Sequence, residues 1–193
     1  MAFGLNSDFL TREQLESLGF SKIGHDVLIH STAVIVNCSR ISIGSRVRID
    51  PFVVISNRGG VEFGNNVHIG SHSVLAGAGE IRLGDFVNIS HYVGIYTSNE
   101  DTSGRTLSHP TVPGGGARSA SIIFGRHSGV GHGSMVLPGA RFDEGSILGA
   151  MSRISRPMKA WTNYAGVPAR RMTERRRDTL AFEEEYLASL RTP

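Results

Sequence analysis

The residues best suited to move a proton gather in one polar stretch, which runs from Ser98 to Ser121. It contains the carboxylates of Glu100 and Asp101 and the imidazole of His109. A carboxylate can accept a proton or bind an ammonium group, and histidine titrates near neutral pH, so each is a candidate general base. Long polar loops are uncommon in compact domains and tend to be functional or disordered. Because this loop interrupts an otherwise regular sequence, we predict that it carries function.

The sequence around this loop repeats every twenty residues, at Ile23-Gly24, Ile43-Gly44, Phe63-Gly64 and Leu83-Gly84. Within each unit an apolar residue recurs every six positions, and the position four further on is small or β-branched. This period matches neither a helix nor a simple strand. It fits a short strand followed by a corner, with three sides in each coil. The sequence therefore predicts an all-β, prism-shaped parallel β-helix in which each coil packs on its neighbours.

We expect a single domain, 1–193, with the β-helix over residues 23–154 and the loop over 98–121. Residues 7–19 read as a helix that caps the first coil, because Thr11 and Gln14 can form a capping box. Its apolar face would hold Leu10, Leu15 and Leu18. Residues 155–193 read as a tail on the ligand side that ends in a helix. This last helix runs from about Thr173 to Leu190, with Glu183, Glu184 and Glu185 pointing outward.

Composition excludes several classes of protein. Of the 193 residues, 24 are glycine, well above the usual level of about 7%. Cys38, the single cysteine, excludes an internal disulfide; we expect a small core residue there and a cytoplasmic location. We expect neither a signal peptide nor a membrane span, since no apolar run approaches about 20 residues. The net charge of +3 comes from an arginine cluster in the tail, without the interleaved aromatics of a nucleic-acid-binding face.

In the hexad repeat, and in the segment Ala165-Gly166-Val167-Pro168-Ala169-Arg170 that follows it, the chain resembles the hexapeptide-repeat acyltransferases. This resemblance implies a left-handed β-helix, an acetyl-CoA donor, and a homotrimer with sites at the subunit interfaces. The loop is similar to that of a subgroup linked to surface-polysaccharide sugars. The matching segments are Ser98-Asn99-Glu100-Asp101, Ser103-Gly104 and His109-Pro110-Thr111-Val112-Pro113.

The same resemblance implies where coenzyme A would lie. In the family the closing segment runs along the coenzyme, with basic residues near its phosphates, and arginine suits phosphate oxygens. The implied cofactor-binding residues are Gly131, Ser134, Gly149, Ala150, Ser155, Arg156, Pro168, Arg170 and Arg171. The alternative is that Gly166 and Pro168 merely form a turn and Arg170 faces solvent.

The resemblance leaves the general base open. In the galactoside and maltose acetyltransferases a histidine early in the loop is the base, and Glu100 stands at that place here. His72 occupies the place of an active-site asparagine, at an outward hexad position on the coil below the loop. The catalytic candidates are therefore His72, Glu100 and Asp101, followed by His109. The substrate-binding candidates beside them are His91, Tyr96 and Asn99.

Eight histidines also raise the alternative of a zinc enzyme similar to the γ-carbonic anhydrases. His127 and His132 have a plausible ligand spacing, but their hexad positions do not match, and Leu137 stands where a further ligand should be. We therefore expect no metal. The function that we predict is acetyl-CoA-dependent O- or N-acetylation of a sugar, nucleotide-linked or part of a polysaccharide precursor, by direct attack on the thioester. The zinc enzyme and a non-catalytic scaffold or sugar-binding module remain alternatives.

Overall fold

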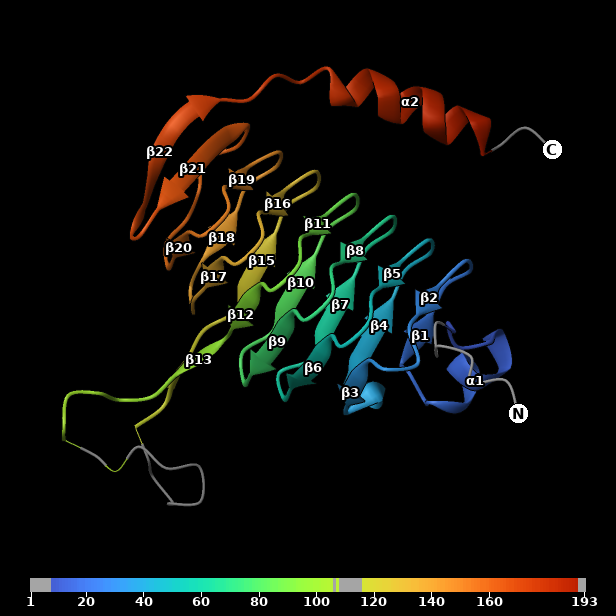
Figure 1. Ribbon diagram of the computed structural model, residues 1–193, viewed down its shortest axis with the longest axis horizontal. Helices are drawn as coiled ribbons and strands as arrows, with labels where there is room; N and C mark the ends of the chain where they lie inside the picture. The colour runs from blue at the N-terminus through green and yellow to red at the C-terminus, as the bar shows by residue number, and fades with distance from the viewer. Residues whose placement is uncertain (1–7, 106, 108–115, 191–193) are drawn as a thin grey trace, which may run out of the picture.

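The chain winds into a parallel β-helix with three sides, as the repeat predicts (Figure 1). The computed structural model describes residues 8–105, 107 and 116–190. In this part of the chain three sheets form the sides of the prism, and each coil adds one parallel strand to each sheet. The predicted fold class is therefore confirmed.

Each sheet collects strands that are one coil apart in the sequence. The first sheet holds β1 (Lys22–Ile23), β4 (Ile41–Ile43), β7 (Val61–Phe63), β10 (Ile81–Leu83), β15 (Ile122–Phe124) and β18 (Arg141–Phe142). The second holds β2 (Leu28–Ile29), β5 (Arg48–Ile49), β8 (His68–Ile69), β11 (Asn88–Ile89), β16 (Gly129–Val130), β19 (Ile147–Leu148), β21 (Thr162–Gly166) and β22 (Ala169–Glu174). The third holds β3 (Val34–Val36), β6 (Val54–Asn57), β9 (Val74–Gly77), β12 (Gly94–Tyr96), β17 (Met135–Val136) and β20 (Arg153–Ile154).

The register of these strands follows the hexad pattern. Phe63 pairs with Leu83 across a step of twenty residues, and Leu83 pairs directly with Phe124 on the far side of the loop. The loop therefore leaves the solenoid without displacing the next coil. Beyond it the step shortens to eighteen residues, as in the pairing of Phe124 with Phe142, because these coils lack the two extra corner residues.

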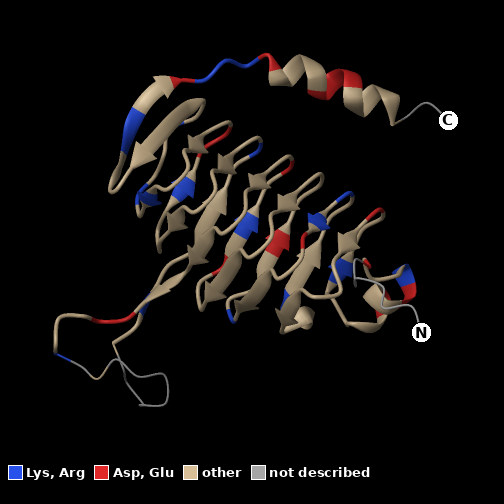
Figure 2. Ribbon diagram, in the orientation of Figure 1, with Lys and Arg blue, Asp and Glu red and all other residues tan. Residues whose placement is uncertain are grey.

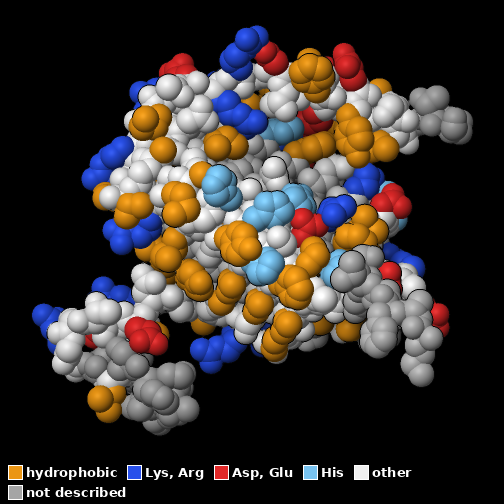
Figure 3. All heavy atoms as spheres, in the orientation of Figure 1, with side chains coloured by type: hydrophobic (Ala, Val, Ile, Leu, Met, Phe, Trp, Pro, Cys, Tyr) orange, Lys and Arg blue, Asp and Glu red, His pale blue; other side chains and the backbone are white. Residues whose placement is uncertain are grey.

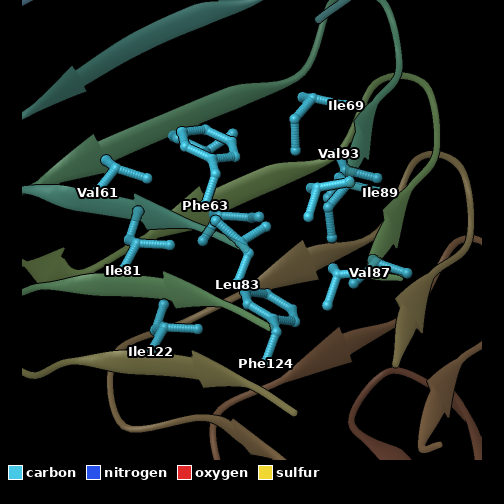
Figure 4. Close-up of a cluster of buried hydrophobic side chains, with 14 of the residues drawn as sticks. Val61, Phe63, Ile69, Ile81, Leu83, Val87, Ile89, Val93, Ile122 and Phe124 are labelled. Atoms are coloured by element: carbon cyan, nitrogen blue, oxygen red, sulfur yellow. The ribbon is translucent and has the colours of Figure 1, made fainter. Parts of the chain in front are cut away.

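Inward-facing side chains form one continuous column of apolar residues (Figure 4). In the three-residue strands of the first sheet two positions point inward, such as Ile81 and Leu83 of β10, which are both at most 2% exposed. Each coil places an aliphatic or aromatic residue on its equivalent in the next coil, which buries apolar area on both sides. This stacking explains why a strict sixfold period specifies the fold.

Close backbone contact between coils requires glycine at the start of several corners. A Cβ on Gly44 would lie 2.6 Å from the carbonyl carbon of Gly64 in the next coil, and backbone atoms there cannot move aside.

We expect Gly44→Ala to lower the free energy of unfolding by about 1–3 kcal/mol, as overpacking does. Chemical denaturation monitored by circular dichroism measures this change. Gly149→Ala is the control with milder crowding, because its nearest atoms are further away: the Ala165 Cβ at 3.2 Å and the Tyr164 carbonyl oxygen at 3.3 Å. Equal stabilities of the two variants would contradict the explanation.

The N-terminal helix α1 (Arg12–Ser17) closes the first coil. Its capping box is present, since the Thr11 hydroxyl accepts from the Gln14 N–H and the Gln14 side chain accepts from the Thr11 N–H. Leu15 is 1% exposed and joins the core, whereas Leu18 is 42% exposed, so the expectation of a shared buried face was wrong for Leu18. A helix this short buries only one turn of side chains.

The C-terminal segment differs from the predicted helix. Residues from Ala169 to Glu174 form strand β22, which pairs antiparallel with β21 and covers the open edge of the second sheet. Uncovered sheet edges expose unpaired backbone groups, which explains the preference for a strand here. Helix α2 (Thr179–Ser189) begins later and runs back along the solenoid (Figure 1). Glu183, expected to point outward, is instead 7% exposed.

The outer faces of the sheets differ in character. The first sheet carries opposite charges on neighbouring strands, such as Glu62 on β7 and Arg82 on β10, 3.7 Å apart (Figure 2). The third sheet exposes apolar side chains, among them Val34, Val36 and Met135. Cys38 was expected in the core but is half-buried in a short 3-10 helix, Cys38–Arg40, because the chain there turns a corner. No helix in the described part of the chain is long and apolar enough to span a bilayer.

Candidate functional site

The predicted loop begins in a neck, which is a short antiparallel pair of strands. Strand β13 (Ser98–Asn99) pairs antiparallel with β14 (Arg118–Ser119), and the two serine hydroxyls lie 2.8 Å apart. Below the neck, Thr97 is fully buried; its hydroxyl accepts from the Asn57 amide at 3.0 Å and donates to the Ala76 carbonyl at 3.2 Å. The loop therefore projects from the solenoid in a defined direction (Figure 1).

The two predicted carboxylates lie just beyond this neck. Glu100 and Asp101 line a cleft of about 550 Å³, together with Asn99 and Arg118. Glu100 is exposed, while Asp101 is half-buried and its Oδ1 accepts from the Ser103 N–H at 2.9 Å. The arrangement places carboxylate oxygens at an open cleft, where they can bind an ammonium group or take up its proton. His109 lies outside the described residues.

The predicted histidines lie on the solenoid, at the corner between the second and third sheets. His72 has a left-handed backbone conformation, with φ of 61°, and its ring stacks on Tyr92 at 4.8 Å. His91 accepts a hydrogen bond from the Ser71 N–H at its Nδ1, over 3.0 Å, so its own proton sits on Nε2. Both rings are exposed. Tyr96 lies on the third sheet, where its ring occupies the space above Gly94.

Most of the tail residues predicted to bind coenzyme A come together. Ser155, Arg156, Pro168 and Arg170 line one cleft of about 240 Å³. Arg156 also joins the two segments that line this cleft, because its guanidinium donates to the Ala169 carbonyl at 3.0 Å. Arg171 instead pairs with Glu174 at 3.0 Å on the surface.

Of the remaining predicted coenzyme residues, Gly131 and Ser134 lie one coil nearer the loop, and Gly149 and Ala150 precede β20 in the same coil as Ser155. Gly131, Gly149 and Ala150 form a glycine-rich backbone stack, in which a Cβ on Gly131 would lie 2.8 Å from the Gly149 carbonyl carbon. Ser134 is 2% exposed, and its hydroxyl donates to the Gly149 carbonyl at 2.8 Å and accepts from the Ser152 N–H at 3.1 Å. Ser134 therefore joins neighbouring coils and presents no side-chain surface to a ligand.

A further cleft, of about 520 Å³, lies between helix α2 and the outer face of the second sheet. This cleft was not predicted from the sequence, although Gly131 is one of its lining residues. The sequence feature that could have indicated this cleft is an aromatic ring at equivalent corner positions of two neighbouring coils. These residues are Phe86 and His127, and their ring centroids lie 5.1 Å apart. The lining residues are Phe86, Asn88, Ser90, His127, Ser128, Gly129, Val130, Gly131, Ile147, Arg175, Thr179, Phe182, Glu183 and Tyr186.

A buried polar cluster fastens α2 over this cleft. The Glu183 carboxylate accepts from His127 Nε2 at 2.8 Å and pairs with Arg126. Arg175 donates to the carbonyls of His127 and Gly145, at 2.8 and 3.1 Å. Burial lowers the pKa of His127 below its ordinary value, and the guanidinium of Arg126 lowers the pKa further. His127 is therefore neutral near pH 7 and donates its one N–H to Glu183.

We expect the docking of α2 to weaken as the pH falls. With α2 detached, His127 takes up a proton near the ordinary histidine pKa of about 6.5. In the docked state its pKa is lower, although Glu144 and Asp85 partly oppose the lowering. Between these two pKa values the detached state binds more protons, so docking loses stability on acidification.

Hydrogen exchange of the α2 amides between about pH 7.5 and about pH 5.5 measures this effect, after correction for the intrinsic rate. His127→Phe keeps an aromatic ring in place and removes the titration, so its protection should not depend on pH in this window. The same pH dependence in both proteins would refute the assignment.

No cluster of three or more His, Cys, Asp or Glu side chains that could hold a metal ion occurs among the described residues. The solenoid, the acid-bearing loop and the arginine-lined cleft at its closing hairpin together define an acyltransferase of the hexapeptide-repeat class.

Comparisons with known proteins place the chain within this class. It is 37% identical over 184 residues to the dTDP-4-amino-4,6-dideoxy-D-glucose acyltransferase of Escherichia coli, covering 94% of this chain and 96% of that enzyme. A variant of AntD, an N-acyltransferase from Bacillus cereus in complex with dTDP and coenzyme A, superposes with a TM-score of 0.90 at 36% identity. That match covers 95% of this chain and 99% of AntD. AntD bound to dTDP and 3-hydroxybutyryl-CoA gives a TM-score of 0.91 at 33% identity, covering 96% and 100% of the two chains. No protein-family profile matches.

The chain belongs to the family of these sugar N-acyltransferases. Its β-helix is left-handed, as the resemblance implied. The prediction of an acyltransferase that acylates a sugar from a coenzyme A thioester is confirmed. The zinc enzyme and the non-catalytic scaffold gain no support.

Proposed function

We propose that this protein transfers an acyl group from acyl-CoA to the amino group of dTDP-4-amino-4,6-dideoxyglucose or a closely similar dTDP-linked amino sugar. The observation that carries the proposal is identity along almost the whole chain to an enzyme named for that activity. A further variant of AntD, 35% identical to this chain, binds dTDP-4-amino-4,6-dideoxyglucose together with coenzyme A.

The reaction needs a neutral amine, because an ammonium group has no electron pair with which to attack. The amine nitrogen bonds to the thioester carbonyl, the tetrahedral intermediate expels the coenzyme A thiolate, and the nitrogen gives up a proton. Glu100 and Asp101 suit this chemistry: an open pair of carboxylates can hold the ammonium form and accept the proton that it loses. His72 remains the rival base.

We also propose a homotrimer with sites at its subunit interfaces. The loop that carries Glu100 projects away from its own solenoid, so a second chain is needed to place coenzyme against it. The third sheet and its corner with the second sheet offer an apolar surface for such contact. Val34, Val36 and Met135 are exposed on the sheet, and Phe52, Tyr92 and Met151 are exposed at the corner. Exposed apolar patches of this kind mark association surfaces.

Light scattering during gel filtration tests the trimer through its mass, which should be three times the 20.8 kDa of one chain. Mixed assemblies test the shared site. Glu100→Gln chains combined with Arg156→Gln chains should regain activity, because some interfaces then receive intact residues from both partners. A monomeric mass, or mixing without any recovery, would contradict the shared site.

The acceptor and donor are tested by mass spectrometry of products. We expect acylation of dTDP-4-amino-4,6-dideoxyglucose with acetyl-CoA or with 3-hydroxybutyryl-CoA, and the ratio of the two rates identifies the donor. dTDP-6-deoxyglucose, which differs only in having a hydroxyl in place of the amine, is the matched control and should not react. Acylation of that control, or no product from the amino sugar with either donor, would refute the proposal. The cytoplasmic location stays a prediction, and assays of separated cell fractions test it.

A further inference from the structure

A network of charged side chains lies on the outer face of the second sheet, away from the loop and the tail. Arg48 on β5 pairs in register with His68 on β8, and His68 pairs with Asn88 on β11. Neighbouring strands in a sheet are about 4.8 Å apart, so these side chains form a short polar ladder. Figure 3 shows histidine side chains gathered on this view of the molecule, beside an acidic and a basic side chain.

A buried carboxylate organises the ladder. Asp50 is 6% exposed, and it accepts from Arg48 Nε at 2.7 Å and from His68 Nε2 at 2.8 Å. Burial alone would raise the pKa of Asp50, but the hydrogen bonds from His68 and Arg48 outweigh burial and hold the pKa below its ordinary value. Asp50 therefore stays ionised and fixes both basic side chains in place.

His68 lies between two acceptors. Its Nε2 faces Asp50, and its Nδ1 lies 3.0 Å from the Asn88 Oδ1 atom. Both ring nitrogens therefore have a hydrogen-bond partner. Arg48 and His68, two basic side chains, share the single carboxylate of Asp50.

The sharing of one carboxylate by two basic side chains distinguishes the ladder from the charges on the first sheet. Arg82 there is balanced by Glu80 and Glu62, at 2.8 and 3.7 Å. Arg48 instead remains 52% exposed, with its guanidinium over the ring of Phe9 at 5.0 Å. Asp50 engages only the Nε–H, and the other guanidinium N–H groups have the geometry that phosphate oxygens need.

Asn88 connects the ladder to the cleft beneath α2, because its side chain also lines that cleft. A ligand whose anionic part rests on Arg48 and His68 can therefore continue past Asn88 into the cleft. Gly129 and Gly131 lie on the far side of the same cleft, one coil closer to the arginine-lined cleft of the tail.

We propose that Arg48 and His68, positioned by Asp50, bind the diphosphate of the nucleotide sugar and direct its sugar past Asn88 into the cleft. This assignment rests on the proposed function, since it takes a nucleotide diphosphate as the substrate class. Arg48 and His68 are binding residues in it, and Asp50 is a positioning residue.

Calorimetric titration of the full-length protein with dTDP, thymidine and coenzyme A tests the proposal. For Arg48→Gln we expect the Kd for dTDP to rise by about ten- to hundredfold, as loss of a charged hydrogen-bond partner does. The affinities for thymidine and coenzyme A should not change. Arg82→Gln is the matched control, because Arg82 is 55% exposed and its replacement removes the same charge from another face.

Each other outcome is decisive. Unchanged dTDP binding by Arg48→Gln, with intact binding by the wild-type protein, would overturn the site and leave the proposed function standing. Equal losses for dTDP and thymidine would overturn the assignment to the diphosphate. A wild-type protein that binds coenzyme A but not dTDP would overturn the proposed function, and this inference with it.

Asp50→Asn tests the positioning role separately. In this variant we expect weaker dTDP binding together with loss of the hydrogen bond at His68 Nε2, which nitrogen chemical shifts of the ring report. An unchanged Nε2 signal in Asp50→Asn would show that Asp50 does not hold His68 in place.

Discussion

Replacement of both loop carboxylates, as Glu100→Gln with Asp101→Asn, should lower kcat by about 10²- to 10⁴-fold, the usual contribution of general acid–base catalysis. The amide side chains keep the size and much of the polarity of the originals, but they neither accept a proton nor attract an ammonium group. Both residues line the cleft at the base of the projecting loop. Because they lie apart from the arginine-lined cleft, the affinity for acyl-CoA should not change.

Initial rates at saturating substrates, together with calorimetry of coenzyme A, measure this prediction. The two single variants then show whether one carboxylate dominates. Glu62→Gln removes an exposed carboxylate from the first sheet, 60% exposed, and should keep full activity. His72→Gln is the rival test: a large loss there, with nearly normal turnover in the double variant, would move the base to the histidine.

Phe124→Ala should lower the free energy of unfolding by about 3–5 kcal/mol, the usual cost of emptying a core position that held phenylalanine. Phe124 is 1% exposed, and its ring packs on Phe142 at a centroid distance of 4.5 Å. It also follows Leu83 in the column of stacked side chains (Figure 4). The cavity would open in the first coil after the loop. The neighbouring side chains of the column cannot fill the space that the ring leaves.

Chemical denaturation at equal protein concentrations measures the loss, because the stability of an oligomer depends on concentration. Ile123→Ala is the matched control: Ile123 lies on the same strand but faces outward and is 41% exposed. Its replacement should cost less than about 1 kcal/mol. Similar costs at both positions would contradict the inward and outward assignment of β15.

The features that could be predicted from sequence are those set by neighbouring coils. Ile43, Phe63 and Leu83 pair as the repeat requires, because each buries its side chain on its own equivalent one coil away. The capping box of α1 and the position of the loop between β12 and β15 also follow from local sequence. In each case the physical cause acts over a few residues or one fixed period.

Other features depend on contacts that no local pattern encodes. Thr173 and Glu174, where the expected helix began, belong to β22 because β21 has an exposed edge, and that edge exists only once the solenoid has formed. Glu183 reads as a surface residue in its run of three glutamates, yet it pairs with His127, which is 56 residues distant. Asp50, Arg48 and His68 likewise gain their arrangement from the stacking of two coils.

The sequence by itself therefore determined the β-helix, its core, the loop with its carboxylates and the class of reaction. Only the tertiary structure decided that α2 covers a cleft on the second sheet and that Arg48, Asp50 and His68 form a charged ladder leading into it. The reason is physical. A repeated apolar pattern specifies its own partners through burial, whereas a polar side chain acquires its charge state and its partner from whatever the fold brings beside it.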